Sequence, residues 1–198
     1  KKNNFIYNIY KNKVLYIIFF SILFIFLFLY DLSIQYYVLG TDKVGVDVRR
    51  LMDDMLQTMY AAPGVGLAAP QVGVLKRVIV VDVARADENP QPICLANPQI
   101  ISASDAFSVF EEGCLSLPEH FAEVKRPDRV RLRYLDYENE ICEKDMEGFL
   151  AKCIQHEIDH FDGVLFVDHI SSLKRGMILR KLTKLQKVGA DAKAKAGV

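Results

Sequence analysis

The sequence lacks a charge excess of either sign, because 25 lysines and arginines are balanced by 25 aspartates and glutamates. Without a global positive field, nucleic acid is not indicated as the main partner. The four cysteines include no CxxC pair and are too sparse for a disulfide-stapled secreted domain, which favours a reducing compartment. No internal repeat is visible either, so the 198 residues are expected to form one folded domain, with an appendage at most.

The first forty residues differ from the rest, since they contain no alanine and hold 12 of the 21 aromatic residues. Within them, residues 14–30 run for 17 positions without a charge, which is the short end of what a tilted bilayer-crossing helix needs. We therefore predict an atypical hydrophobic extension over residues 1–40. It is a possible membrane anchor with a weak preference for a cytoplasmic N-terminus. The alternatives are a buried strand pair, or non-native sequence joined to a domain whose own start is missing, which the absent initiating methionine fits.

The pattern of apolar residues after the extension predicts a helix and then strands. Helical spacing indicates an amphipathic helix over residues 48–59, and a β-branched run indicates a strand buried on both faces over residues 76–83. Residues 108–118 are typical of an irregular strand that ends at Pro118. Residues 129–136 alternate as in a strand with one exposed face.

The C-terminal third is predicted to be helical. One helix is expected over residues 147–161 with Gly163 as its stop, and a basic amphipathic helix over residues 171–188. Residues 189–198 have too few large apolar groups to stay ordered, so we predict a disordered tail. One helix, several strands and two further helices indicate an α+β domain over residues 41–188.

The predicted helix over residues 147–161 carries an HExxH motif. Positions i and i+4 share a helix face, so His156 and His160 can reach one metal ion, while Glu157 is close enough to act on a metal-bound water. The alternative is a surface helix with two chance histidines. A catalytic zinc-like site also needs a third protein ligand and an open position.

The third ligand is not supplied by the neighbouring sequence. The longer HExxHxxGxxH motif is excluded because its last histidine would fall at Phe166, and His169 lies outside that spacing. Cys153 is seven residues from His160, a rise of about 10.5 Å, which metal bonds cannot span, so Cys153 is expected to pack beside the site. The best donor is Cys114, whose alternative role is that of a small buried hydrophobe.

Three stretches together resemble the signature motifs of peptide deformylases, in the family's order and at similar spacings: GVGLAAPQ (64–71), EGCLS (112–116) and QHEIDH (155–160). The resemblance implies an α+β, peptide-deformylase-like fold with antiparallel strands around a central HExxH helix, plus a C-terminal helix. It implies removal of the formyl group from the N-terminal formylmethionine of nascent chains, with release of formate.

The resemblance also implies the cofactor and the catalytic roles. One divalent ion would be held by Cys114, His156 and His160; Fe²⁺ is the expected ion, although zinc or other divalent ions suit the same ligands. Glu157 would act as general base and then as general acid. The side-chain amide of Gln71 and the backbone N–H of Leu115 would donate hydrogen bonds to the oxyanion. Gly66 would let the backbone of the peptide substrate approach closely.

Residues in or near the motifs are expected to bind the substrate. Four side chains could line an apolar slot for the methionine side chain, although each could instead belong to the core: Val65, Phe110, Phe149 and Cys153. Gly66 and Glu112 complete the predicted binding set. Two departures from the family pattern stand out. The hydrophobic forty residues replace the usual PDPxLR segment, and Lys152 lies where an apolar or small residue is expected.

Two other functions compete with this interpretation. A membrane-tethered zinc peptidase is weakened by Phe166 and gives no role to the first two motifs. A metal-stabilised binding module could contact the ribosome through a basic stripe whose alternative is a solvated helix face: Lys174, Arg175, Arg180, Lys181, Lys184 and Lys187. A deformylase would work in the cytoplasm or a bacteria-derived organelle, and would meet a membrane only if residues 14–30 are an anchor.

Overall fold

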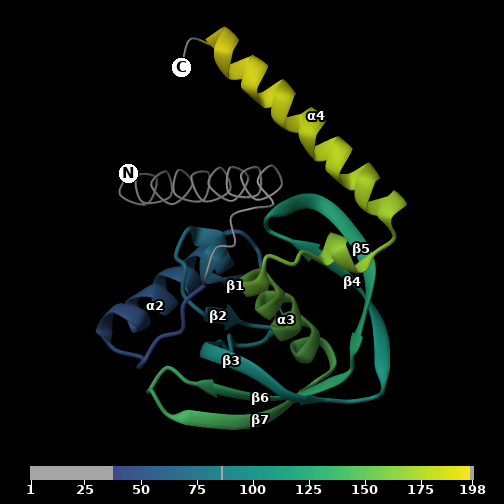
Figure 1. Cartoon of the computed structure of the whole chain (residues 1–198). Coiled ribbons are helices and arrows are strands. Elements are labelled where there is room, and N and C mark those ends of the chain that lie inside the picture. The colour runs from purple at the N-terminus through teal and green to yellow at the C-terminus, as the bar shows by residue number, and fades with distance from the viewer. Residues whose placement is uncertain (1–37, 86, 197–198) are drawn as a thin grey trace.

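The computed structural model describes residues 38–85 and 87–196 (Figure 1). The predicted extension over residues 1–40 lies almost wholly outside the described residues. Within the described part, every helix is too short or too polar to cross a bilayer.

The main sheet has five antiparallel strands in the order β1-β2-β3-β6-β7. The strands are β1 (Gly66–Ala68), β2 (Val78–Val81), β3 (Ile93–Ala103), β6 (Arg129–Leu135) and β7 (Ile141–Glu147). All four residues of β2 are buried, because helices cover both faces of the sheet there. The predictions of a doubly buried strand over 76–83 and of a strand over 129–136 are therefore confirmed, whereas the sequence pattern did not reveal β3 and β7.

Two helices cover opposite faces of this sheet. Helix α2 (Val46–Ala61) buries Val48, Met52, Met55 and Met59 against one face, which confirms the predicted amphipathic helix. Helix α3 (Gly148–Asp159) packs on the other face and continues into the 3₁₀ turn η2 (His160–Asp162). Gly163 follows in the left-handed conformation, with φ of 69°, and ends the helix as expected.

A two-stranded sheet lies on the far side of α3, so that α3 occupies the centre of the molecule (Figure 1). Its strands are β4 (Phe107–Cys114) and β5 (Leu117–Pro127). The predicted single strand over 108–118 is wrong: β4 stops at Cys114, and Pro118 already belongs to the returning strand. Cys114 pairs with Leu117 beyond a bulge at Gly113, so the cysteine lies at a tight chain reversal.

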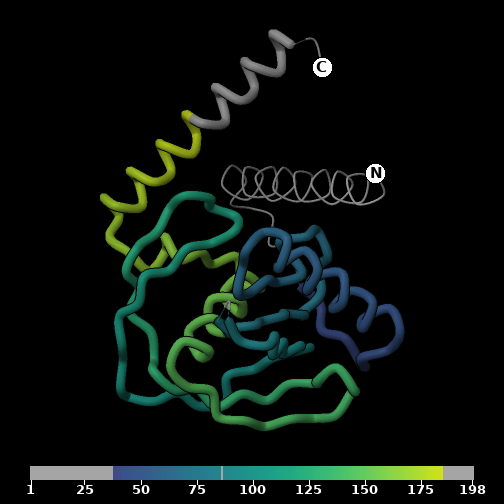
Figure 2. The backbone as a smooth tube through the Cα atoms, turned by 180° about the vertical axis from the view of Figure 1, so that it is seen from behind, coloured from purple at the N-terminus to yellow at the C-terminus, as the bar shows by residue number. Residues whose placement is uncertain are grey.

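The chain ends in a 3₁₀ turn η3 (Phe166–His169) and a long helix α4 (Ser172–Ala196). Phe166 is fully buried among apolar side chains of β5 and α4, which explains why that position carries no metal ligand. Helix α4 then extends away from the body in both views (Figures 1 and 2). Helix α4 continues past the predicted helix end at residue 188 to Ala196, since alanine and lysine are strong helix formers. The disordered tail over residues 189–198 stays a prediction.

Candidate metal centre

Cys114, His156 and His160 meet at the centre of the fold. One ligand atom from each lies within 4.8 Å of the others, and Cys114 Sγ is 3.3 Å from His160 Nε2. The end of β4 places the cysteine beside His156 on α3 and His160 at the start of η2, and the i, i+4 spacing presents both histidines on one face. Cys153 is outside this cluster, as expected from the helix rise between Cys153 and His160. His169 is also outside it, since its Nε2 lies 2.8 Å from Asp159.

Glu112 fixes the orientation of the first histidine. Its Oε2 lies 2.9 Å from His156 Nδ1, so the Nδ1 proton is directed to the carboxylate and Nε2 remains available for a metal ion. Burial opposes ionisation of Glu112, but the hydrogen bonds from His156 and Arg126 outweigh it and hold the pKa of its carboxyl at about 2. Glu112 is therefore ionised whenever the protein is folded near neutral pH.

The electrostatics of the cluster favour a thiolate at Cys114. Burial alone would raise the pKa of the thiol, but the charge of His160 and hydrogen bonds with both histidines outweigh burial and bring that pKa well below its usual value. A thiolate is the form in which cysteine binds metals. One sulfur and two imidazole nitrogens therefore fit a divalent ion such as iron or zinc.

Arg126 links the metal centre to the rest of the helix. Its guanidinium donates to both oxygens of Glu112, at 2.6 and 3.0 Å, and to Asp159 Oδ2 at 2.9 Å. The side chain is buried, so these bonds form in a medium of low dielectric. Because Glu112 holds His156 and Asp159 precedes His160, Arg126 braces both histidines of the candidate metal centre at once.

Replacement of Arg126 by methionine is expected to lower the free energy of unfolding by about 3–5 kcal/mol, because two partly or fully buried carboxylates lose their cation. Chemical denaturation of the two proteins measures this difference. Arg131→Met is the matched control: its ion pairs are exposed, so its cost should stay below about 1 kcal/mol. Equal costs for the two variants would contradict the bracing role of Arg126.

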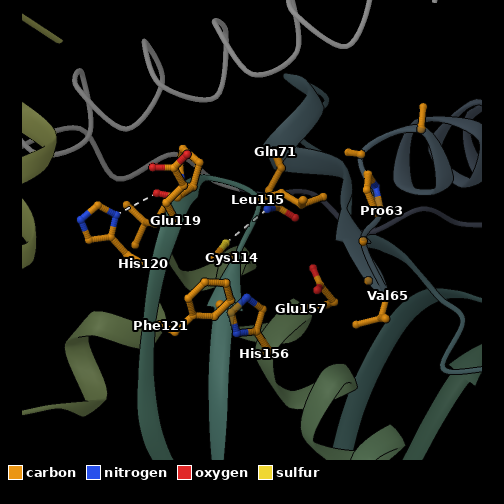
Figure 3. Close-up of a pocket in the computed structure, with 17 residues that line it drawn as sticks. Pro63, Val65, Gln71, Cys114, Leu115, Glu119, His120, Phe121, His156 and Glu157 are labelled. Atoms are coloured by element: carbon orange, nitrogen blue, oxygen red, sulfur yellow. Dashed lines mark hydrogen bonds between the residues drawn. The ribbon is translucent and has the colours of Figure 1, made fainter. Parts of the chain in front are cut away.

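Glu157 points at the same space as Cys114 and His156 (Figure 3). Among the described residues its buried Oε2 has no hydrogen-bond partner, although such atoms are normally paired. Burial raises the pKa of the Glu157 carboxyl to about 7. Gly66 is required beside it, because a Cβ at that position would overlap with Glu157 Oε1. The structure thus gives Gly66 a contact with the glutamate, where the sequence suggested only a contact with a peptide.

The side-chain amide of Gln71 borders the cluster next to Cys114. It lies in the 3₁₀ turn η1 (Ala69–Val72), and its Oε1 accepts a hydrogen bond from the Ala68 N–H at 2.8 Å. This fixes its Nε2, which is 3.6 Å from Cys114 Sγ and donates to Ser116 Oγ at 3.1 Å. Gln71 is therefore held with its amide protons directed at the centre.

Two adjoining cavities open at the centre. The larger, of about 610 Å³, brings together Gln71, Cys114, Leu115, His156 and Glu157 (Figure 3). The smaller cavity, of about 140 Å³, adjoins it and shares four wall residues with it: Val65, Gly113, His156 and Glu157. Its wall contains all five of the side chains predicted to bind substrate: Val65, Phe110, Glu112, Phe149 and Cys153.

The smaller cavity has an aromatic rim. The rings of Phe110 and Phe149 lie 4.9 Å apart, and both side chains are half exposed. Glu112 differs from the other wall residues because both of its oxygens are engaged by Arg126 and His156. Its carboxylate thus orients His156, a role that the sequence analysis did not anticipate.

Sequence reasoning missed three polar residues of the site: Ser116, Arg126 and Asp159. Ser116 lies inside the EGCLS motif and Asp159 inside QHEIDH, so the motifs contained a signal for these two. Arg126 had none, since a basic residue in a polar strand is normally solvated.

A helix of HExxH type whose glutamate faces an open cavity beside a third ligand defines a metal-dependent hydrolase. Such sites occur on several folds, and comparison with known proteins identifies this one. The chain belongs to the polypeptide deformylase family, whose family model matches residues 38–176.

Individual relatives agree with this assignment. The peptide deformylase of Phenylobacterium zucineum is 59% identical over 143 residues, which cover 72% of this chain and 85% of that protein. The crystal structure of peptide deformylase from Ehrlichia chaffeensis is 37% identical, with a TM-score of 0.72, covering 80% of this chain and 96% of that one. The same enzyme in complex with actinonin gives 39% identity and a TM-score of 0.70, covering 77% and 93% of the two chains.

Proposed function

We propose that this chain removes the formyl group from the N-terminal formylmethionine of nascent polypeptides and releases formate, using one divalent ion held by Cys114, His156 and His160. The observation that carries the proposal is the buried carboxylate oxygen of Glu157 that lies beside this cluster and has no hydrogen-bond partner within the described part of the chain. A buried acceptor without a partner is costly, and a water or substrate proton would satisfy it. We assign this activity to residues 41–188.

Glu157 is the proton carrier in this proposal. An ion held by Cys114, His156 and His160 would act as a Lewis acid on the formyl carbonyl and would lower the pKa of a nearby water. Glu157 accepts the proton of the attacking water and later returns it to the leaving amine of methionine. Its pKa of about 7, raised by burial, suits a group that must take up and release a proton near neutral pH.

The substrate is oriented by groups on both sides of the cluster. The Gln71 amide and the Leu115 backbone N–H donate to the formyl oxygen as negative charge develops on it. The peptide backbone pairs alongside β1 as an added strand. The methionine side chain enters the smaller cavity behind Val65, where Phe110, Phe149 and Cys153 are in reach.

The proposal also includes the identity of the metal ion, a surface that contacts the ribosome, and the cellular compartment. Fe²⁺ is the ion we expect, with zinc as the main alternative, since Cys-His-His ligands suit both. The basic side of α4 would contact ribosomal RNA, although Arg175 is already paired with Asp168. We expect the enzyme in the cytoplasm or a bacteria-derived organelle, and at a membrane only if residues 14–30 are an anchor.

Formate release tests the function directly. The Fe²⁺-loaded chain is expected to release formate from formyl-Met-Ala-Ser, and no acid from acetyl-Met-Ala-Ser. Chelation should abolish the release and added Fe²⁺ or Zn²⁺ should restore it, because the ligands remain in place. Cleavage of internal peptide bonds without formate would contradict the proposal and favour the zinc peptidase.

A further inference from the structure

Lys152 is a buried charged side chain in the wall of the smaller cavity, with only 5% of its surface exposed. Among the described residues that line this cavity, it is the one lysine or arginine. Lysine is almost never fully buried unless its charge is paired. Its ammonium group is therefore expected to have a charged or polar partner, and only part of the side chain can face the cavity.

The ammonium group of Lys152 has its partners outside the cavity. Nζ donates to Asp128 Oδ1 at 2.8 Å and to the Gly148 carbonyl at 3.2 Å. Neither partner lines the cavity. The charged end is thus directed away from the cavity, and the part of Lys152 that forms its wall is the methylene stem.

The stem is held in place from two elements. Asp128 Oδ1 also accepts a hydrogen bond from Ser108 Oγ on β4 at 2.7 Å, and the Asp128 carbonyl accepts from the Gly148 N–H at 3.0 Å. Asp128 consequently joins β4, which carries Phe110, to α3, which carries Phe149. A stem anchored between these two walls is a fixed boundary of the cavity.

We propose that Lys152 determines the length of side chain that the smaller cavity accepts, with its paired ammonium holding the methylene stem as the cavity's end wall. This inference rests on the proposed function, because it assigns the cavity to the first side chain of a formylated peptide. A shorter residue at position 152 would extend the cavity towards Asp128. That carboxylate is 49% exposed, so it stays hydrated without the lysine, and the fold should tolerate the change.

The experiment compares formyl-norleucyl-Ala-Ser with formyl-2-aminooctanoyl-Ala-Ser, whose first side chain is two methylenes longer. In the Fe²⁺-loaded Lys152→Ala variant, the ratio of kcat/KM for the longer over the shorter peptide should rise at least about tenfold, the usual worth of a methylene in an apolar pocket. Lys152→Val should move the ratio in the same direction by a smaller factor. It also provides a second variant if alanine impairs folding.

Two controls separate the stem from the charge. Lys152→Met keeps a long unbranched stem without the ammonium, so its ratio should stay within about twofold of the original chain. Arg129→Met removes an exposed ion pair with Glu147 outside the cavity and should not change the ratio. Unchanged ratios in both shortened variants, or an equal shift in Lys152→Met, would overturn the inference. Absence of formate from every peptide with the unaltered chain would instead refute the proposed function.

Discussion

Glu157→Gln is expected to lower kcat for formate release by about 10²–10⁴-fold while leaving the bound metal at one ion per chain. Glutamine has nearly the shape of glutamate, so the contact with Gly66 is kept. Its amide cannot accept a proton from the attacking water. Steady-state assays on formyl-Met-Ala-Ser, together with metal analysis of the same sample, measure both quantities.

Glu123→Gln is the control for this variant, because Glu123 is exposed on β5 and lines neither cavity. Its kcat should match that of the unaltered chain. A Glu157→Gln variant with full activity would remove Glu157 from the proton transfer. A chain that binds formylated peptides equally well before and after the change, and turns over none of them, would be a binding module.

Cys114→Ala is expected to weaken metal binding by more than about 100-fold, because even changes in groups behind the ligands cost 10–100-fold in affinity. The remaining His156 and His160 cannot complete a three-ligand site. Dialysis against a competing chelator followed by metal analysis measures the loss, and formate release should fall with it.

Cys153→Ala provides a matched control, since it removes a cysteine that shares the helix with both histidines but lies outside the cluster. This variant should retain one ion per chain, whatever it does to peptide preference through the cavity wall. Equal metal loss in the two alanine variants would mean that Cys114 is no ligand, and would remove the basis for a Cys-His-His centre.

Features that depend on residues within a single helix or strand were predicted correctly from the sequence. The helical spacing of residues 48–59, the apolar run of β2 and the i, i+4 histidines of α3 depend on the geometry of a single helix or strand. The same geometry excluded Cys153 as a ligand. The resemblance of three motifs then implied the activity and the ligand Cys114, which lies 42 residues before His156.

Chain reversals and edge strands were predicted poorly. The turn after Cys114 was read as the middle of one irregular strand, because the two turn residues, Leu115 and Ser116, include neither glycine nor proline. Strand β7 carries charged residues on its exposed side, so it resembles a loop in composition. Only pairing with β6 makes it a strand.

By itself, then, the sequence determined the helices, the buried strand and the residues of the HExxH motif, because each is encoded by neighbours along the chain. Only the tertiary structure decided that Arg126 braces both histidines of the candidate metal centre, that Glu112 orients His156, and that the ammonium of Lys152 lies outside the cavity that its stem lines. These contacts join residues 14 to 44 positions apart on different elements. Their partners are chosen by packing and by the cost of leaving a buried charge unpaired, which no local pattern records.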